Sequence, residues 1–148
     1  MRLYVAYGSN LNLDQMEYRC PRAKIFAKGI IPNYRLVFRG SKTGSYATII
    51  PAEGYSVPVL VWDITPTDEL SLDIYEGYPT FYYKEDVTVK LDSGESISAM
   101  AYIMFNEAKV GKPSPRYLAT ISAGYSANGL DTSAFYEAID YNRLEMSL

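Results

Sequence analysis

Short segments of β-type residues, separated by turn-forming residues, constrain the fold of this chain more than any other feature. Six segments are rich in aromatic and β-branched residues, and glycine, proline, asparagine and serine punctuate the chain around them. Many short strands with frequent turns are typical of a largely antiparallel sheet that curls toward a barrel. The predicted strands span residues 24–31, 34–38, 47–51, 58–63, 85–91 and 98–105.

The beginning of the chain predicts a strand, a loop and a helix. Apolar and aromatic side chains alternate over residues 3–7, which predicts a buried strand that ends in a tight turn at Gly8-Ser9-Asn10. Asn12 then opens a sequence that resembles a capping box, so a short helix is predicted through about Arg19. Cys20-Pro21 ends that helix.

Three later helices are predicted from their capping residues. Thr65-Pro66-Thr67-Asp68 supplies a cap, a first-turn proline and an acidic third position, so a helix of about 11 residues should end at Glu76, before Gly77. Ser114-Pro115 opens another helix toward Gly124. A last helix begins at Asp131 or Thr132 and runs to about Leu144, and its core face holds Phe135, Ala138 and Ile139.

The length of 148 residues is enough to bury one core without disulfides or metals. We therefore expect a single domain over residues 1–148. Hydrophobic residues make up 48% and charged residues 21%, as in ordinary globular proteins. The chain reaches Gly8 too soon for a secretory signal, and no apolar run approaches the roughly 20 residues of a membrane span. A cytoplasmic location and no membrane partner are therefore expected.

The missing histidine excludes several kinds of chemistry. Without it the chain has no Ser-His-Asp or Cys-His catalysis and no histidine-ligated metal site. The single Cys20 cannot form an internal disulfide or a multi-thiolate metal site, and packing is its expected role. There are 14 basic and 17 acidic residues, with no lysine or arginine block, so no nucleic-acid partner is expected.

The first candidate site is the loop Tyr7-Gly8-Ser9-Asn10-Leu11, between a predicted strand and a predicted helix. Glycine permits close approach of the backbone, and the following helix adds partial positive charge, so the loop could present N–H groups to an anion. The alternative is an ordinary strand-to-helix turn whose side chains satisfy only their own backbone.

The second candidate is Glu76, in the last predicted turn of a helix. The helix dipole there disfavours a negative charge. Burial beside tyrosines such as Tyr75, Tyr78 or Tyr82 would raise its pKa toward neutrality, where a carboxyl group can accept and return protons. The alternative is a solvated glutamate at a frayed helix end. Other acids are expected to cap helices or lie on exposed faces: Asp68, Asp73, Glu85 and Asp86.

Tyrosine is the third unusual feature, with 15 in one small chain. Most are expected to pack in the core or on strand faces. A few could line a pocket that combines apolar walls with hydroxyl groups. The candidates are Tyr82, Tyr83, Tyr102, Tyr117 and Tyr125.

Together these residues resemble the gamma-glutamylcyclotransferase-like family. Tyr4-Val5-Ala6-Tyr7-Gly8-Ser9-Asn10-Leu11 is similar to the family's N-terminal loop, and Leu72-Asp73-Ile74-Tyr75-Glu76-Gly77 is similar to the segment with its catalytic glutamate. The resemblance continues through Ala47-Thr48-Ile49, Tyr82, Val87-Thr88-Val89, Pro113-Ser114-Pro115-Arg116-Tyr117 and Ala127-Asn128-Gly129-Leu130.

The resemblance implies an α+β fold, a small mixed and mainly antiparallel β-barrel with flanking helices. It implies cofactor-free conversion of a small-molecule gamma-glutamyl amide to 5-oxoproline and a free amine, by a monomer or homodimer. Glu76 would be the general acid and base, with no metal. The substrate-binding residues would be Tyr7, Gly8, Ser9, Asn10 and Leu11, with Tyr82 and Tyr117.

Two questions stay open at this level. The aromatic segment 77–83 leaves the leaving group undefined, because it could admit an amino acid or a larger amine. A fold does not determine a function, so the alternative is a non-catalytic module that binds a small anionic gamma-glutamyl-like metabolite. A structural or interaction domain with an incidental pocket is a third interpretation.

Overall fold

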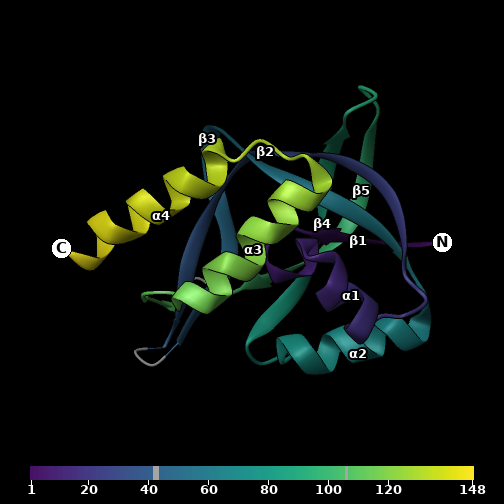
Figure 1. Cartoon of the computed structure of the whole chain (residues 1–148), viewed down its shortest axis with the longest axis horizontal. Helices are drawn as coiled ribbons and strands as arrows, with labels where there is room; N and C mark the ends of the chain where they lie inside the picture. The colour runs from purple at the N-terminus through teal and green to yellow at the C-terminus, as the bar shows by residue number, and fades with distance from the viewer. Residues whose placement is uncertain (42–43, 106) are drawn as a thin grey trace.

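Five strands close into a barrel in the computed structural model, which describes residues 1–41, 44–105 and 107–148. They are β1 (Arg2–Ala6), β2 (Lys24–Ser41), β3 (Gly44–Ile64), β4 (Tyr82–Leu91) and β5 (Ser96–Met104). The order is β3-β1-β5-β4-β2, and β2 also pairs with β3, which completes the ring. β1 runs parallel to β5, whereas the other pairs are antiparallel. The expected mixed, mainly antiparallel barrel is thus confirmed (Figure 1).

The long hairpin of β2 and β3 corrects the sequence prediction. The four strands predicted over residues 24–31, 34–38, 47–51 and 58–63 are two continuous strands. The strand partners shift register between Pro32 and Tyr34, where Asn33 has a left-handed φ of 62°. The Asn33 side chain accepts a hydrogen bond from the Gly54 N–H at 3.2 Å. The turn-forming residues therefore make a bulge inside a hairpin instead of separating strands.

The predicted capping residues begin and end the first two α-helices. A short 3-10 turn, η1 (Ser9–Leu11), leads into α1 (Leu13–Arg19), where Asn12 accepts the Gln15 N–H. In α2 (Pro66–Glu76), Thr65 and Asp68 form a capping box. Gly77 then stops the helix in the left-handed conformation, with φ of 65°.

Helix α3 (Pro115–Asn128) runs past the predicted stop at Gly124. A side chain at Gly124 would lie within 2.8 Å of the backbone of Leu11 and Asn12, so this glycine lets α3 pack directly on the loop after β1. Gly129, with φ of 62°, is the true helix stop. The predicted end was wrong because this glycine serves packing between elements and not termination.

Helix α4 (Ser133–Met146) packs on β2, and its buried residues include the predicted core residues Phe135 and Ala138. In Figure 1, α3 lies across the front of the barrel, α4 extends to its left, and α2 lies along its lower edge. A two-residue strand, β6 (Lys109–Val110), pairs with β2 near Arg39. The barrel interior and the helix contacts form one hydrophobic cluster.

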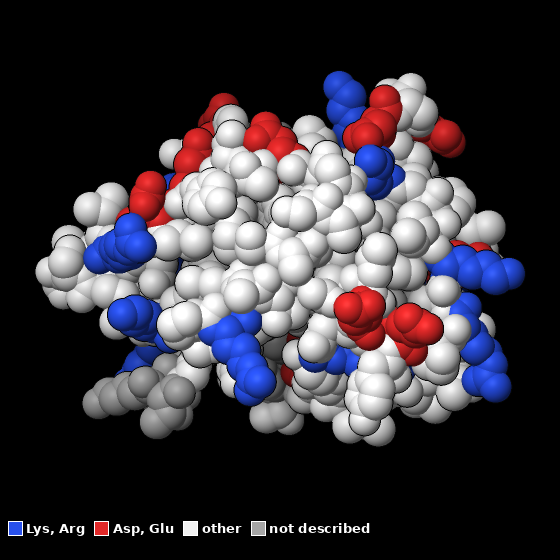
Figure 2. Space-filling model, viewed as in Figure 1, with Lys and Arg blue, Asp and Glu red and all other residues white. Residues whose placement is uncertain are grey.

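Charged residues are spread over the molecule. On the face in Figure 2, basic and acidic side chains lie mostly around the edge, and uncharged side chains fill the centre. Within the described ranges, no helix is long and apolar enough to span a membrane.

Candidate active site

A cavity of about 370 Å³ opens where the loop after β1, the end of α2 and the barrel strands meet. This volume is at the small end of ligand pockets, which hold about 300–1,000 Å³. The predicted site residues that line it are Tyr7, Gly8, Ser9, Asn10, Glu76, Tyr82 and Tyr117. Leu11 does not line the cavity. Its side chain is fully buried in the core, and its carbonyl accepts a hydrogen bond from Asn128 at 2.8 Å.

The loop is held by side chains, which separates it from an ordinary exposed turn. Ser9 and Asn10 are buried although both are polar. The Asn10 side-chain amide donates to the Tyr4 hydroxyl at 2.9 Å. The first N–H groups of the turn have no partner inside it, and Gly8 provides no side-chain cap. The loop therefore presents a rigid, polar edge to the cavity.

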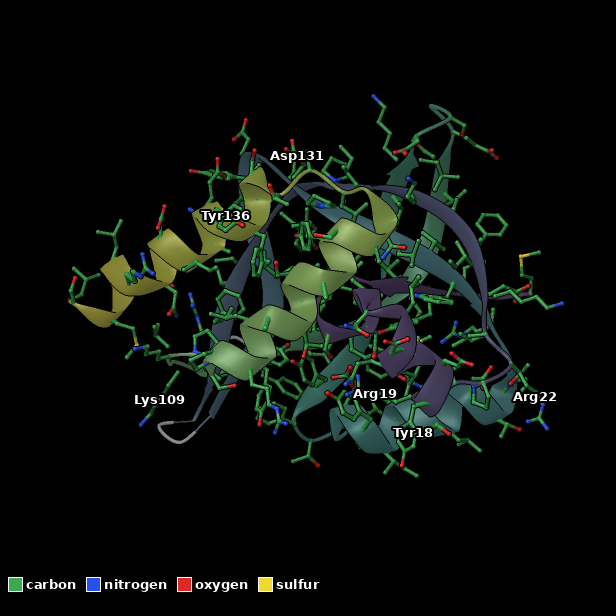
Figure 3. All side chains as sticks on the ribbon, viewed as in Figure 1. Tyr18, Arg19, Arg22, Lys109, Asp131 and Tyr136 are labelled. Atoms are coloured by element: carbon green, nitrogen blue, oxygen red, sulfur yellow. The ribbon has the colours of Figure 1, made fainter. Side chains whose placement is uncertain are left out.

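Arg19, a residue that the sequence analysis did not select, connects this loop to α2. Its guanidinium donates to the Ser9 hydroxyl at 3.2 Å and to the side-chain amide oxygen (Oδ1) of Asn10 at 2.5 Å. The same group stacks on the Tyr75 ring, with its carbon 3.3 Å from the ring centroid. Figure 3 shows Arg19 between α1 and α2, and its neighbour Tyr18 is exposed on the surface.

Arg19 lies in the last turn of α1, where a positive charge is favourable because of the helix dipole. That local explanation needs no partner outside the helix. Only the packing of α1 against α2 brings the guanidinium to Tyr75, so no pattern in the sequence marked it as part of a site.

Glu76 is the last residue of α2 and borders the cavity, as predicted. Burial raises the pKa of its carboxyl group to about 7, and the positive charge of Arg19 partly opposes this increase. Within the described part of the chain, no group donates a hydrogen bond to the carboxylate, which would have lowered its pKa. The carboxyl group can therefore exchange protons near neutral pH.

Two tyrosine hydroxyls hold strand β3 at Ala47, which lines the same cavity as Glu76. Tyr82 donates to the Ala47 carbonyl at 2.8 Å, and the Ala47 N–H donates to the Tyr117 hydroxyl at 3.0 Å. Because Tyr117 is the acceptor in this bond, its own proton stays available to a ligand. Burial raises the pKa of both hydroxyls, so they remain protonated at neutral pH.

The other tyrosine candidates divide between the cavity and the core. Tyr102 lines the cavity, and its carbonyl accepts a hydrogen bond from the Tyr7 hydroxyl at 2.5 Å. Tyr125 is fully buried against Phe135, with ring centroids 5.3 Å apart. Tyr83 packs on Phe105, which directly follows β5. Tyr83 and Tyr125 are thus core and strand-face residues.

Asp73 is not the exposed or capping charge that the sequence predicted. It accepts a hydrogen bond from the Tyr102 hydroxyl at 2.6 Å and forms an ion pair with Lys84 at 2.9 Å. Lys84 also pairs with Glu69, which in turn binds Arg2. This network attaches α2 to the barrel behind the cavity wall. Elsewhere in the described ranges, no three cysteine or acidic side chains form a group that could hold a metal ion.

Comparisons with known proteins agree with this architecture. Residues 4–122 match the family described as gamma-glutamyl cyclotransferase, AIG2-like. The gamma-glutamylcyclotransferase of Bos taurus is 35% identical over 136 residues, which cover 86% of this chain and 72% of that protein. The gamma-glutamylcyclotransferase of Homo sapiens has the same identity and coverage.

The folds agree as well. A solved structure of a gamma-glutamyl cyclotransferase superposes with a TM-score of 0.79 at 30% identity, and covers 99% of this chain and 87% of its own. The match extends over the loop after β1 and the end of α2, which form the cavity. The chain therefore belongs to the gamma-glutamyl cyclotransferase, AIG2-like family and is a cyclising enzyme of that family.

Proposed function

We propose that this enzyme converts a gamma-glutamyl amino acid or gamma-glutamyl amine to 5-oxoproline and a free amine, with Glu76 as general acid and base. The observation that supports this most directly is a carboxyl group with a pKa of about 7 at the edge of a small cavity. A base with a pKa near the working pH combines a useful ionised fraction with enough basicity to accept a proton.

The reaction needs no protein nucleophile. The substrate's own α-amine attacks its γ-carbonyl carbon, so a ring C–N bond forms as the amide C–N bond to the leaving amine breaks. Glu76 accepts a proton from the substrate ammonium and later donates one to the leaving nitrogen. Because the attack is intramolecular, the enzyme's main task is to hold the substrate in a folded shape.

The loop is the proposed site for a substrate oxygen. Backbone N–H groups of Gly8, Ser9 and Asn10 would bind either the α-carboxylate or the developing oxyanion. Arg19 adds positive charge behind the loop without lining the cavity. The Tyr117 hydroxyl oxygen lies 3.5 Å from the position that a Cβ atom on Gly8 would occupy. Its free proton would therefore also donate to the substrate oxygen held by the loop.

The test is direct detection of the product. Purified full-length protein is incubated with a panel of gamma-glutamyl dipeptides and gamma-glutamyl amines, and 5-oxoproline is measured by mass spectrometry. We expect product with the unmodified enzyme and almost none with Glu76→Gln, which preserves shape but cannot take up the proton. Calorimetric binding of a gamma-glutamyl dipeptide to the variant checks that its cavity is intact.

The possible outcomes separate the candidate functions. Product that disappears in Glu76→Gln supports both the reaction and the assigned base. Near-full activity in Glu76→Gln contradicts the role of Glu76. Binding without product from any substrate would favour a ligand-binding module.

A further inference from the structure

The cavity has two chemically different halves. Its floor is buried and polar: Ser9 is 8% exposed and Asn10 is 3% exposed, and both line the cavity together with Glu76. Its mouth is aromatic and partly open, because Tyr46 is 43% exposed and Phe81 is 40% exposed. Exposed aromatic rings at the rim of a ligand cavity need an explanation, since they leave apolar area in water.

The aromatic mouth is organised around Phe81 and Tyr46. Their rings make an edge contact with centroids 6.1 Å apart. Tyr46 also contacts the Tyr117 ring at 5.4 Å, and Phe81 contacts the Tyr82 ring at 5.3 Å. The two exposed rings therefore rest on two cavity tyrosines, of which Tyr82 is buried and Tyr117 is partly buried. A further aromatic group could pack on these rings in the same edge-to-face geometry or in an offset stack.

Phe81 is also tied to the end of α2. A side chain built at Gly77 would lie 3.1 Å from the Phe81 Cβ, so the backbone beside Glu76 touches the base of the ring. Phe81 thus packs against the residue that directly follows the proposed acid and base. A group attached to the nitrogen that Glu76 protonates would extend toward these rings.

We propose that the Tyr46–Phe81 mouth is the leaving-group subsite, and that it selects gamma-glutamyl amides whose leaving amine carries an aromatic or large apolar group. This inference rests on the proposed function. The gamma-glutamyl unit carries an ammonium and a carboxylate, which need the polar floor around the loop and Glu76. The leaving amine then occupies the mouth, where the exposed rings offer apolar contact.

No lysine or arginine lines the cavity among the residues that the structure describes, and Glu76 is its only acid or base of ordinary strength. An acidic leaving side chain would gain no ion pair at the mouth and would lose hydration there. A phenyl group would cover Tyr46 and Phe81 and remove their apolar area from water. The subsite therefore favours phenylalanine-like leaving groups over glycine and over glutamate.

The experiment compares kcat/KM for three substrates: gamma-glutamylphenylalanine, gamma-glutamylglycine and gamma-glutamylglutamate. We expect the phenylalanine substrate to exceed the glycine substrate by about tenfold, with the glutamate substrate no better than glycine. Equal values for phenylalanine and glycine would overturn the subsite while leaving the proposed function intact. No turnover of any of the three would overturn both.

Alanine variants test whether the preference for an aromatic leaving group arises at the Tyr46–Phe81 mouth. In Phe81→Ala, which keeps the Cβ that packs on Gly77, the value for the phenylalanine substrate should fall about tenfold more than that for glycine. The matched control is Phe105→Ala, an equally exposed ring that packs on Tyr83 and does not line the cavity. Its substrate ratio should stay unchanged.

A general loss of folding would lower all three values together and would not change their ratio. If Phe81→Ala and Tyr46→Ala both retain the wild-type ratio, the mouth is not the leaving-group subsite.

Discussion

Two glutamates on the same helix have opposite surroundings. Glu69, near the start of α2, binds Arg2 at 2.8 Å and Lys84 at 2.7 Å. The hydrogen bond from Arg2 is the largest influence, and it lowers the pKa of Glu69. Glu76, seven residues later, is desolvated beside the cavity, and its pKa rises to about 7.

The difference lies in which partners the fold provides. Cations on β1 and β4 reach the carboxylate of Glu69 and stabilise its ionised form. The cation whose charge acts on Glu76, Arg19, instead uses its donors on Ser9 and Asn10. It therefore moderates the pKa of Glu76 by charge alone. The same residue type thus serves structure at one end of α2 and is available for proton transfer at the other.

The largest effect expected from this contrast is on catalysis. Glu76→Gln should lower kcat by roughly 10²–10⁴-fold, because the group that moves the proton is lost. Glu69→Gln should leave kcat within about threefold, since Glu69 does not line the cavity. Steady-state rates of 5-oxoproline formation at pH 7.5 measure both. Equal losses in the two variants would show that α2 geometry, and not proton transfer, limits the rate.

Stability should separate the two glutamates next, with opposite signs. The folded-state pKa of Glu76 is raised. Its favourable contribution to folding stability is therefore complete below about pH 4.5 and is lost as the pH rises through 7. Glu76→Gln should therefore be more stable than wild type at pH 8.5, by roughly 2 kcal/mol. This figure is smaller than the full pKa shift implies, because the carboxyl group is partly exposed to solvent. The difference should vanish near pH 4.

Glu69 should show the reverse dependence. Its folded-state pKa is lowered, so its contribution is present above its ordinary pKa and is lost as the pH falls through the folded value. Glu69→Gln should cost about 1 kcal/mol at neutral pH and almost nothing in strong acid. Urea unfolding at pH 3.5, 7 and 8.5 tests both variants, and a destabilised Glu76→Gln at pH 8.5 would argue against a desolvated carboxylate.

The smallest expected effect concerns Arg19. Its positive charge lowers the pKa of Glu76, so Arg19→Met should move the acid limb of kcat/KM upward from pH 7, by up to about one unit. Arg19→Lys keeps the charge but not the planar fork that binds Ser9 and Asn10. It should raise KM while the acid limb stays close to pH 7. Identical pH profiles for wild type and Arg19→Met would show that Arg19 only holds the loop.

Local sequence signals predicted the elements that carry the site. The capping box at Thr65 and the left-handed stop at Gly77 placed Glu76 at the end of α2, and Asn12 placed the start of α1. These predictions hold because each depends on hydrogen bonds within a few residues. Gly124 and the break between residues 31 and 34 were misinterpreted, because the role of Gly124 depends on the loop after β1 and that of Asn33 on strand β3, far away in the chain.

The sequence by itself determined the helices, the segments of the chain that are β-structure, the barrel class, and the loop and glutamate that the family resemblance indicated. Propensity, capping and motifs depend on residues that are close together in the sequence, so they can be recognised without coordinates. Tertiary structure decided the rest: the position of Arg19 on Tyr75, the network around Asp73, the core position of Leu11 and the aromatic mouth at Phe81. Each depends on contacts between elements distant in sequence, where burial and charge act through space.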